Sequence, residues 1–199
     1  MRFERTDAPN YFHSDERFDE LYPLPVAVLA EQHWTPLAVS RKAAAFLAVE
    51  DKSRILDIGS GVGKFCLAAA QYAPNALFYG VEQRKRLVHH AEKAKESLGI
   101  VNAQFIHANF TQLNFNAYDH FYFYNAFYEN LIGTDKIDHN IDYSSELYHY
   151  YSRYLYRQLD QKPSGTRIVT YHSTEDEIPR DYYVAESLMN NLLKCWIKA

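Results

Sequence analysis

Three glycines within five residues are the feature of this sequence that most directly suggests chemistry. Gly59, Gly61 and Gly63 follow the apolar run 54–58 and precede a stretch of helical composition at 65–72. Glycine alone tolerates positive φ and has no Cβ, so a turn of this kind brings the backbone close to a ligand. The amides of the turn and the positive end of the following helix then face that ligand. The pattern predicts a nucleotide-type cofactor site on a strand, a glycine turn and a helix.

The spacing of the glycines distinguishes between cofactors. A dinucleotide site requires Gly-x-Gly-x-x-Gly/Ala, but the third position is Lys64 in one register and Cys66 in the other. Asp57 and the three glycines instead fit Asp-x-Gly-x-Gly-x-Gly, which resembles the pattern of class I methyltransferases that use S-adenosylmethionine (SAM). This resemblance implies that the loop, Ser60 included, holds the methionine part of SAM. A nicotinamide enzyme is the alternative, which NAD binding would reveal.

Polar residues also follow the next two apolar runs. Glu82 ends the second run, where a carboxylate can accept hydrogen bonds from two ribose hydroxyls, and Gln83 comes directly after it. After the third run, 103–107, Asn109 is expected to meet the adenine amino group while Phe110 covers the ring. The structural alternatives are an exposed carboxylate at a strand end, a turn asparagine and a core phenylalanine.

Two further stretches border the expected cofactor site. Thr35 precedes Pro36, and we expect it to cap the helix that starts there and to contact the methionine carboxylate of SAM. The strand 118–124 ends at Asn125, and Phe127 follows at the edge where methyltransferases of this class place groups near the reactive methyl. Asn125 is therefore assigned to cofactor and substrate orientation, and Phe127 to the wall around the acceptor.

The alternation of apolar runs with helical patterns predicts an α/β fold. Together with the methyltransferase pattern, it indicates a Rossmann-like, mostly parallel seven-stranded sheet with helices on both faces. A C-terminal antiparallel hairpin over 182–189 and 192–197 completes it, although 182–195 also fits a helical period. We interpret 1–35 as an N-terminal arm and SAM-covering segment and 36–199 as a single methyltransferase domain. The other expected elements are strands at 54–58, 76–81, 103–107, 118–124 and 166–171, and helices at 36–48, 65–72, 84–98 and 144–161.

The composition excludes several other classes of protein. With 199 residues, of which 47% are hydrophobic, the chain can bury one substantial core. A net charge of -4 gives no general attraction to nucleic acid, and two cysteines form no disulfide framework. The sequence has no apolar run of membrane-spanning length and no signal peptide, so we expect a cytoplasmic protein without a membrane partner. His89 and His90 lack a matching acidic or cysteine cluster, so no metal site is predicted.

Several stretches resemble the Dot1-type histone lysine methyltransferases. They are the glycine loop from Asp57, the segment 79–83, the segment 108–110 and the segment 124–127, and Thr35 matches a threonine in the SAM-covering loop of that family. The resemblance, which spans about residues 31–130, implies N-methylation of a lysine-type amine on a protein. The sequence departs from the family because Asn109 stands where an acidic residue is usual, and because no long basic extension is present.

Other acceptors are kept as alternatives. A small molecule or an RNA is one, although the segment 125–128 lacks the two prolines typical of enzymes that methylate exocyclic amines of bases. A non-catalytic SAM-binding module is another. In the transfer itself, Asn125 would orient the substrate while Phe127 and Tyr128 desolvate it, and an amine acceptor would also need a base, which the sequence does not identify. The 17 tyrosines serve either as core and rim packing or as a stacking platform for bases.

Overall fold

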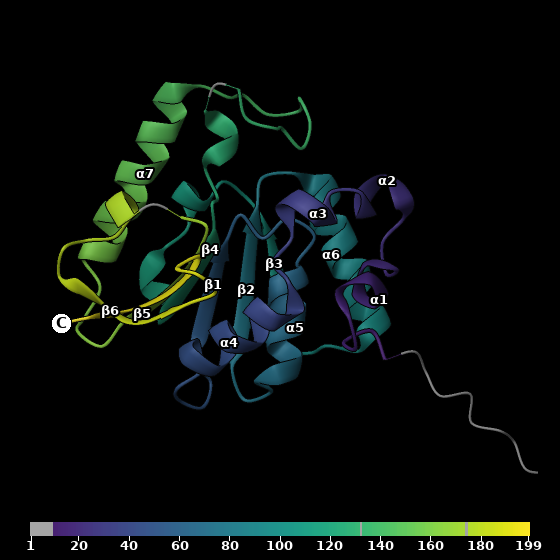
Figure 1. Cartoon of the computed structure of the whole chain (residues 1–199), viewed down its shortest axis with the longest axis horizontal. Coiled ribbons are helices and arrows are strands. Elements are labelled where there is room, and N and C mark those ends of the chain that lie inside the picture. The colour runs from purple at the N-terminus through teal and green to yellow at the C-terminus, as the bar shows by residue number, and fades with distance from the viewer. Residues whose placement is uncertain (1–9, 132, 174) are drawn as a thin grey trace, which may run out of the picture.

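A computed structural model describes residues 10–131, 133–173 and 175–199 (Figure 1). The first nine residues of the predicted arm lie outside the described residues. A seven-stranded sheet runs through the molecule in the order β3-β2-β1-β4-β5-β7-β6, parallel except where β7 pairs with β5 and β6. This confirms the predicted fold class. The strands are β1 (Arg54–Ile58), β2 (Leu77–Glu82), β3 (Ala103–His107), β4 (His120–Tyr124), β5 (Arg167–Tyr171), β6 (Tyr182–Leu188) and β7 (Leu193–Lys198).

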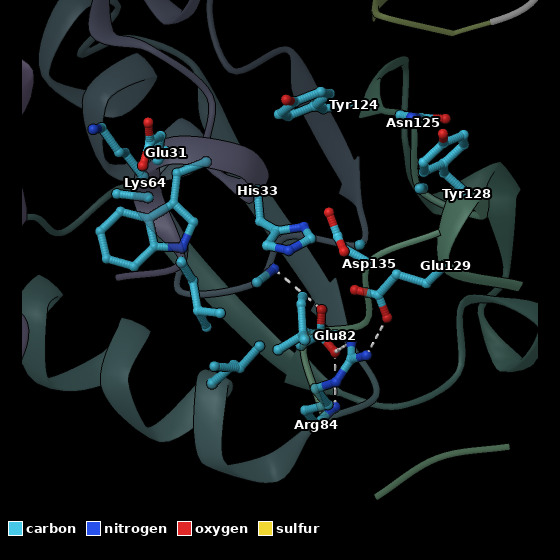
Figure 2. Close-up of a pocket in the computed structure, with 18 of the residues that line it drawn as sticks. Glu31, His33, Lys64, Glu82, Arg84, Tyr124, Asn125, Tyr128, Glu129 and Asp135 are labelled. Carbon is cyan, nitrogen blue, oxygen red and sulfur yellow. Dashed lines mark hydrogen bonds and ion pairs between the residues drawn. The ribbon is translucent and has the colours of Figure 1, made fainter. Parts of the chain in front are cut away.

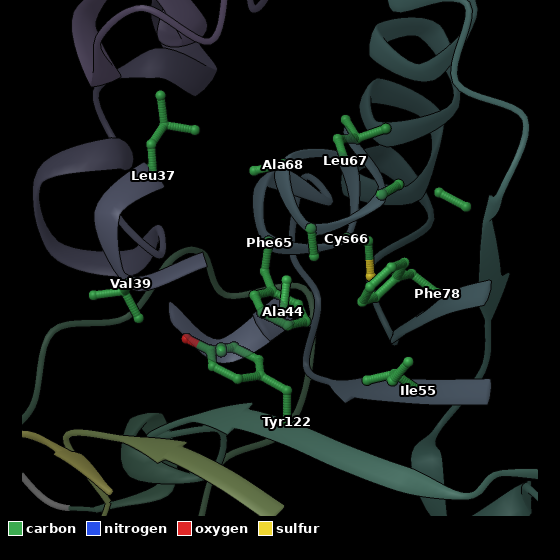
Figure 3. Packing of buried hydrophobic residues seen from close by; sticks show 14 of the residues in the cluster. Leu37, Val39, Ala44, Ile55, Phe65, Cys66, Leu67, Ala68, Phe78 and Tyr122 are labelled. Atoms are coloured by element: carbon green, nitrogen blue, oxygen red, sulfur yellow. The ribbon is translucent and has the colours of Figure 1, made fainter. Parts of the chain in front are cut away.

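Helices cover both faces of the sheet because successive side chains of each strand point to opposite sides. Ile55 and Tyr122 belong to the core cluster that α4, α5 and α6 cover, and in Figure 3 the ring of Phe65 lies over that of Tyr122, with 3.7 Å between ring centroids. Leu56 and Phe121 belong to the cluster that α7 covers. The helices are α1 (Asp15–Asp19), α2 (Leu24–Ala27), α3 (Ala30–His33), α4 (Leu37–Leu47), α5 (Lys64–Tyr72), α6 (Lys85–Leu98) and α7 (Ser145–Asp160), with short 3-10 turns η1 (Phe110–Gln112), η2 (Phe115–Ala117), η3 (Tyr128–Asn130) and η4 (Glu175–Glu177).

The C-terminal segment forms the predicted hairpin, and the competing helix is wrong. The turn between β6 and β7 contains three consecutive residues in the left-handed region, Met189, Asn190 and Asn191, with φ of 52°, 56° and 68°. Asparagine tolerates this conformation better than most residues because its short side chain bonds locally. Two adjacent asparagines thus favour the turn over continuation of a helix.

The N-terminal segment packs into the same core as the sheet. Phe18, Tyr22 and Trp34 belong to the cluster that contains α4 and α5, and the hydroxyl of Tyr22 donates to the carbonyl of Val62 at 3.0 Å. Figure 1 places α1, α2 and α3 together on the side of the molecule where α5 and α6 lie. Among the described residues, no helix is both long and apolar enough to cross a membrane. The boundary between residues 35 and 36 stays a prediction.

The predicted helix cap at Thr35 is wrong. The helix α4 begins at Leu37, with Pro36 as its N-cap residue and no side-chain cap within the segment. The hydroxyl of Thr35 is instead buried against the hydroxyl of Tyr122, 2.8 Å away. The carboxylate of Asp15, from α1, accepts from the amide of Leu37 at 2.9 Å and takes the place of the cap. Sequence spacing missed this contact because Asp15 lies 22 residues upstream.

Candidate functional site

A cavity of about 870 Å³ opens at the carboxyl ends of β1, β2 and β4, the edge where ligands bind in open α/β sheets. We call it the main cavity. The glycine loop and Glu82 form its floor, and α2 and α3 form one wall (Figure 2). Residues from 124–130 and 135–143 form the opposite wall. Two smaller cavities of about 30 Å³ each adjoin the loop, one beside Asp57 and one beside Phe110.

The three glycines of the loop have different structural roles. All three have positive φ, of 77° at Gly59, 54° at Gly61 and 82° at Gly63. A Cβ at Gly63 would lie 2.4 Å from the ring of Phe105 and 2.9 Å from Cβ of Ala91, so this glycine lets the start of α5 pack closely against β3 and α6. A Cβ at Gly61 would meet nothing within 4 Å, and Gly61 lines the main cavity. Gly61 is therefore the position where the backbone is open to a ligand.

Glu82 is held in place beneath this open backbone. Its side chain is buried, with one carboxylate oxygen accepting from the amide of Arg84 at 2.8 Å and the other from the amide of Gly61 at 3.2 Å. Burial raises the pKa of Glu82, while the nearby charge of Arg84 and the two amides oppose that rise. Each oxygen keeps a further lone pair, which can accept from a ribose hydroxyl.

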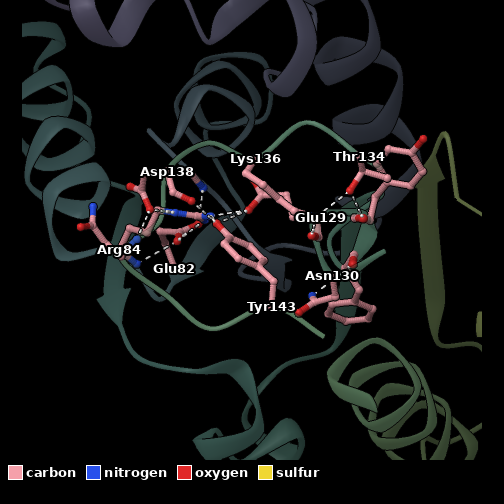
Figure 4. Close-up of polar contacts among 12 residues, drawn as sticks. Glu82, Arg84, Glu129, Asn130, Thr134, Lys136, Asp138 and Tyr143 are labelled. Carbon is pink, nitrogen blue, oxygen red and sulfur yellow. Dashed lines mark hydrogen bonds and ion pairs between the residues drawn. The ribbon is translucent and has the colours of Figure 1, made fainter. Parts of the chain in front are cut away.

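Arg84 is a site residue that the sequence analysis did not identify. Its guanidinium pairs with Glu82, Glu129 and Asp138, with a nitrogen-to-oxygen distance of 3.3 Å to Asp138, and donates to the hydroxyl of Tyr143 at 2.7 Å (Figure 4). These contacts tie the end of β2 to the segment that forms the far wall of the main cavity. No local pattern signals them, because Glu129, Asp138 and Tyr143 lie 45 to 59 residues further along the chain.

Lys64 is a second residue that sequence reasoning passed over, beyond its use in excluding a dinucleotide pattern. The side chain is buried at the start of α5, and its ammonium pairs with Asp15 at 2.8 Å and Asp19 at 2.6 Å. It also lies over the rings of Phe18 and Trp34. These contacts hold the N-terminal segment against the glycine loop. Residues of the N-terminal segment thereby form one wall of the main cavity.

Asp57, Ser60 and Thr35 come together around one of the small cavities. Asp57 is buried and accepts from the thiol of Cys66 at 3.5 Å. Ser60 Oγ is buried and has no hydrogen-bond partner among the described residues. A buried hydroxyl without a partner is costly unless a ligand or water satisfies it. Open backbone at Gly61, the carboxylate of Glu82 and the unsatisfied Ser60 hydroxyl together fit a ligand with ribose and amino-acid groups, as SAM has.

The titration of Asp57 should make stability depend on pH. Burial raises its pKa to about 8, which the thiol of Cys66 opposes and the charge of Glu82 reinforces. A carboxyl with a higher pKa folded than unfolded holds its proton more tightly in the native state. Its contribution to the free energy of unfolding therefore falls as pH rises from about 4 to about 8, by up to about 1.4 kcal/mol per pH unit.

Urea unfolding of the wild type and of Asp57→Asn, measured from pH 5 to pH 9, checks this expectation. The free energy of unfolding of the wild type should fall more steeply than that of the variant, whose amide does not titrate. The difference between the two curves removes the contributions of other carboxyls, such as Glu177, whose pKa burial raises to about 7. Parallel curves would show that Asp57 ionises normally in the native protein.

The predicted adenine-binding residues lie beside the second small cavity. Phe110 lines it and stacks on Phe127, with 5.1 Å between ring centroids, while Gln83 also borders it. Asn109 is not among the described residues that line any of these cavities. The side-chain amide nitrogen of Asn109 donates to the side chains of Gln83 and Tyr151. Its side-chain oxygen accepts from the backbone N–H of Thr111. The adenine roles of Asn109 and Phe110 stay predictions.

The two residues assigned to catalysis lie in different surroundings. Asn125 lines the main cavity with a left-handed φ of 44°, and its backbone N–H donates to Ser173 Oγ at 3.3 Å. Phe127 is buried in the core cluster under α7 and is not among the described residues that line the main cavity. Tyr128, which is 47% exposed, lines the main cavity instead. The structure therefore brings Asn125 and Tyr128 to the expected acceptor side and Phe127 beneath it.

The sequence resembles those of several known proteins. A family model described as "Methyltransferase domain" matches residues 49–198. A tRNA (guanine-N(7)-)-methyltransferase of Synechococcus sp. (strain JA-3-3Ab) is 48% identical over 54 residues, which are 27% of this chain and 23% of that protein. One of Microcystis aeruginosa (strain NIES-843 / IAM M-2473) is 36% identical over 91 residues, 41% of this chain and 42% of that protein. The matches thus span less than half the length of these curated relatives.

Solved structures of similar fold include several methyltransferases. TrmN from Thermus thermophilus superposes with a TM-score of 0.58 at 16% identity over 84% of this chain and 49% of that chain. An RNA methyltransferase from Salinibacter ruber, in complex with S-adenosyl-L-homocysteine, gives 0.56 at 16% identity over 83% and 92%. Magnesium protoporphyrin IX methyltransferase from Synechocystis PCC 6803, with bound SAM, gives 0.55 at 18% identity over 96% and 85%. At these identities the likeness concerns the fold.

Proposed function

The chain belongs to the methyltransferase domain family, and from this premise we propose that it transfers the methyl group of SAM to guanine N7 in an RNA. The class of enzyme is SAM-dependent methyltransferase. The observation that carries the choice of acceptor is the similarity to tRNA (guanine-N(7)-)-methyltransferases. An RNA acceptor was the alternative reading of the sequence, and it now replaces the protein lysine implied by the Dot1 resemblance as the leading hypothesis.

The chemistry of this acceptor suits the residues around the main cavity. Bound SAM supplies a methyl group already activated on a sulfonium. Guanine N7 carries a lone pair and no proton, so its methylation needs no general base, unlike that of a lysine amine. Transfer leaves a positive charge on the purine. Glu31 and Asp135 line the main cavity and have exposed carboxylates without an ion-pair partner among the described residues, so they can stabilise this charge.

The residues of the chain would divide the remaining work between binding and orientation. Gly61 and Glu82 hold the cofactor at the floor, and the wall tied by Arg84 fixes the acceptor side. Asn125 orients the base edge through its amide, while Tyr128 offers an exposed ring for the base to lie against. His33 also lines the main cavity (Figure 2), and burial lowers its pKa, which favours the neutral imidazole. Positioning of this kind accounts for most of the catalysis of a group transfer.

Methyl transfer from tritium-labelled SAM tests the proposed acceptor. Purified protein is incubated with a cell extract, which is then separated into RNA, protein and metabolite fractions. Label in the RNA fraction, removed by ribonuclease, is the expected result. Label in protein that survives ribonuclease would instead support the lysine acceptor, and SAM binding without transfer to any fraction would support a non-catalytic module.

A further inference from the structure

A second concave surface, which we call the α7 groove, lies on the outer face of α7. It encloses about 520 Å³. In Figure 1, α7 stands at the upper left, away from α1, α2 and α6. The residues that line the groove come from successive turns of α7 and from η4, and they are Glu146, Tyr150, Ser152, Arg153, Tyr156, Arg157 and Asp176.

The groove gives a role to tyrosines of α7 that do not pack in the core. The inner face of α7 is buried through Tyr151 and Leu155, in the core cluster with Phe127. The outer face carries Tyr150, which is 49% exposed, and Tyr156 also lines the groove. Aromatic rings left at a concave surface form stacking platforms, on which a base contributes through its π face whatever its identity.

The charged groups of the groove select for a nucleotide. Arg153 and Arg157 are four residues apart and thus neighbours on the helix surface, and neither has an ion-pair partner among the described residues. The Nε of Arg153 donates to the carbonyl of His149 at 3.2 Å, which orients its guanidinium. Two adjacent, unpaired guanidinium groups match phosphate oxygens. Glu146 and Asp176, which line the same groove, can accept from amino groups of bases.

One polar group in the groove lacks a partner. Ser152 Oγ is buried and makes no hydrogen bond to any described residue, although it lines the groove. A hydroxyl in this state is satisfied when a ligand brings a donor or an acceptor to it. Stacking rings, unpaired guanidinium groups and an unsatisfied hydroxyl therefore converge on one surface, and each suits a different part of a nucleotide.

We propose that the α7 groove binds a nucleotide in a single-stranded segment of the substrate RNA, with its base on Tyr150 and its phosphates on Arg153 and Arg157. This inference rests on the proposed function. Tyr143 lines the main cavity, and α7 begins two residues later. A single-stranded RNA segment can therefore run from the cavity onto the outer face of α7. Within the groove the phosphate contacts fall to Arg153 and Arg157, whose charges Glu146 and Asp176 balance over the groove as a whole.

Fluorescence polarisation with a labelled tRNA transcript tests the groove directly. We expect Arg153→Ala combined with Arg157→Ala to weaken RNA binding at least tenfold, and the slope of log affinity against log salt to fall by about 1.4, at about 0.7 for each phosphate contact to single-stranded RNA. Tyr150→Ala should weaken binding roughly tenfold through lost stacking, and Tyr150→Phe should restore it. The dissociation constant for SAM should not change in any of these variants.

Arg41→Ala is the matched control, because Arg41 is an exposed arginine of α4, on the other face of the sheet. It should bind RNA as the wild type does. If the wild type methylates tRNA and the double arginine variant binds and methylates it equally well, the groove inference is overturned while the proposed function stands. If the wild type neither binds nor methylates RNA, both fail. An unchanged urea midpoint shows that the variants remain folded.

Discussion

Glu82→Ala should weaken SAM binding about a hundredfold. The carboxylate of Glu82 faces the main cavity with both oxygens fixed, one by the amide of Arg84 and one by that of Gly61. Two charge-assisted hydrogen bonds to ribose hydroxyls, at roughly 1.5 kcal/mol each, amount to about 3 kcal/mol. Because about 1.4 kcal/mol corresponds to a factor of ten in affinity, the expected loss is about two orders of magnitude.

Isothermal titration calorimetry with SAM measures this loss. Glu82→Gln is the matched variant, since it keeps one acceptor oxygen and about the same volume, and it should lose less affinity than the alanine variant. Should Glu82→Ala bind SAM as tightly as the wild type, Glu82 does not hold the ribose and the floor of the main cavity has another use.

Gly63→Ala should destabilise the protein by about 3 kcal/mol. At a φ of 82°, a Cβ costs about 1 kcal/mol. It would also lie 2.4 Å from the ring of Phe105 and 2.9 Å from Cβ of Ala91. Relief of these contacts requires movement of β3 or α6, and overpacking of this kind costs about 2 kcal/mol. The free energy of unfolding from urea titration gives the measured value.

Gly61→Ala separates conformational strain from crowding. Its φ of 54° is also left-handed, but an added Cβ would meet no atom within 4 Å. We expect it to cost only about 1 kcal/mol of stability, and to weaken SAM binding because the methyl group would occupy ligand space in the main cavity. A Gly63→Ala protein as stable as Gly61→Ala would contradict the packing role given to Gly63.

The elements that follow local patterns could be predicted from the sequence. Asp57, the glycine loop and Glu82 lie within one strand-turn-helix-strand unit, where spacing in the chain determines position in space. The terminal hairpin was predictable because Asn190 and Asn191 favour a left-handed turn. In each case the decisive interaction joins residues that are near neighbours in the chain or in adjacent strands.

Contacts between distant segments were not predictable in the same way. Arg84 is the first residue of the predicted helix 84–98, whereas its partners Glu129 and Asp138 belong to a segment without regular patterning. Thr35 has the residue type of a helix cap, but tertiary packing turns its hydroxyl to Tyr122. Phe127 follows the correct strand end, yet the short turn η3 directs it into the core under α7, so that Tyr128 lines the main cavity.

The acceptor atom is the central claim, and the most direct measurement of it uses two tRNA transcripts that differ at that atom. One contains guanosine and the other 7-deazaguanosine, in which a C–H group replaces N7 and leaves the base-pairing edge intact. With labelled SAM, we predict label in the first transcript, recovered as 7-methylguanosine after nuclease digestion, and none in the second. Equal labelling of both transcripts, or label recovered at another position, would contradict transfer to guanine N7.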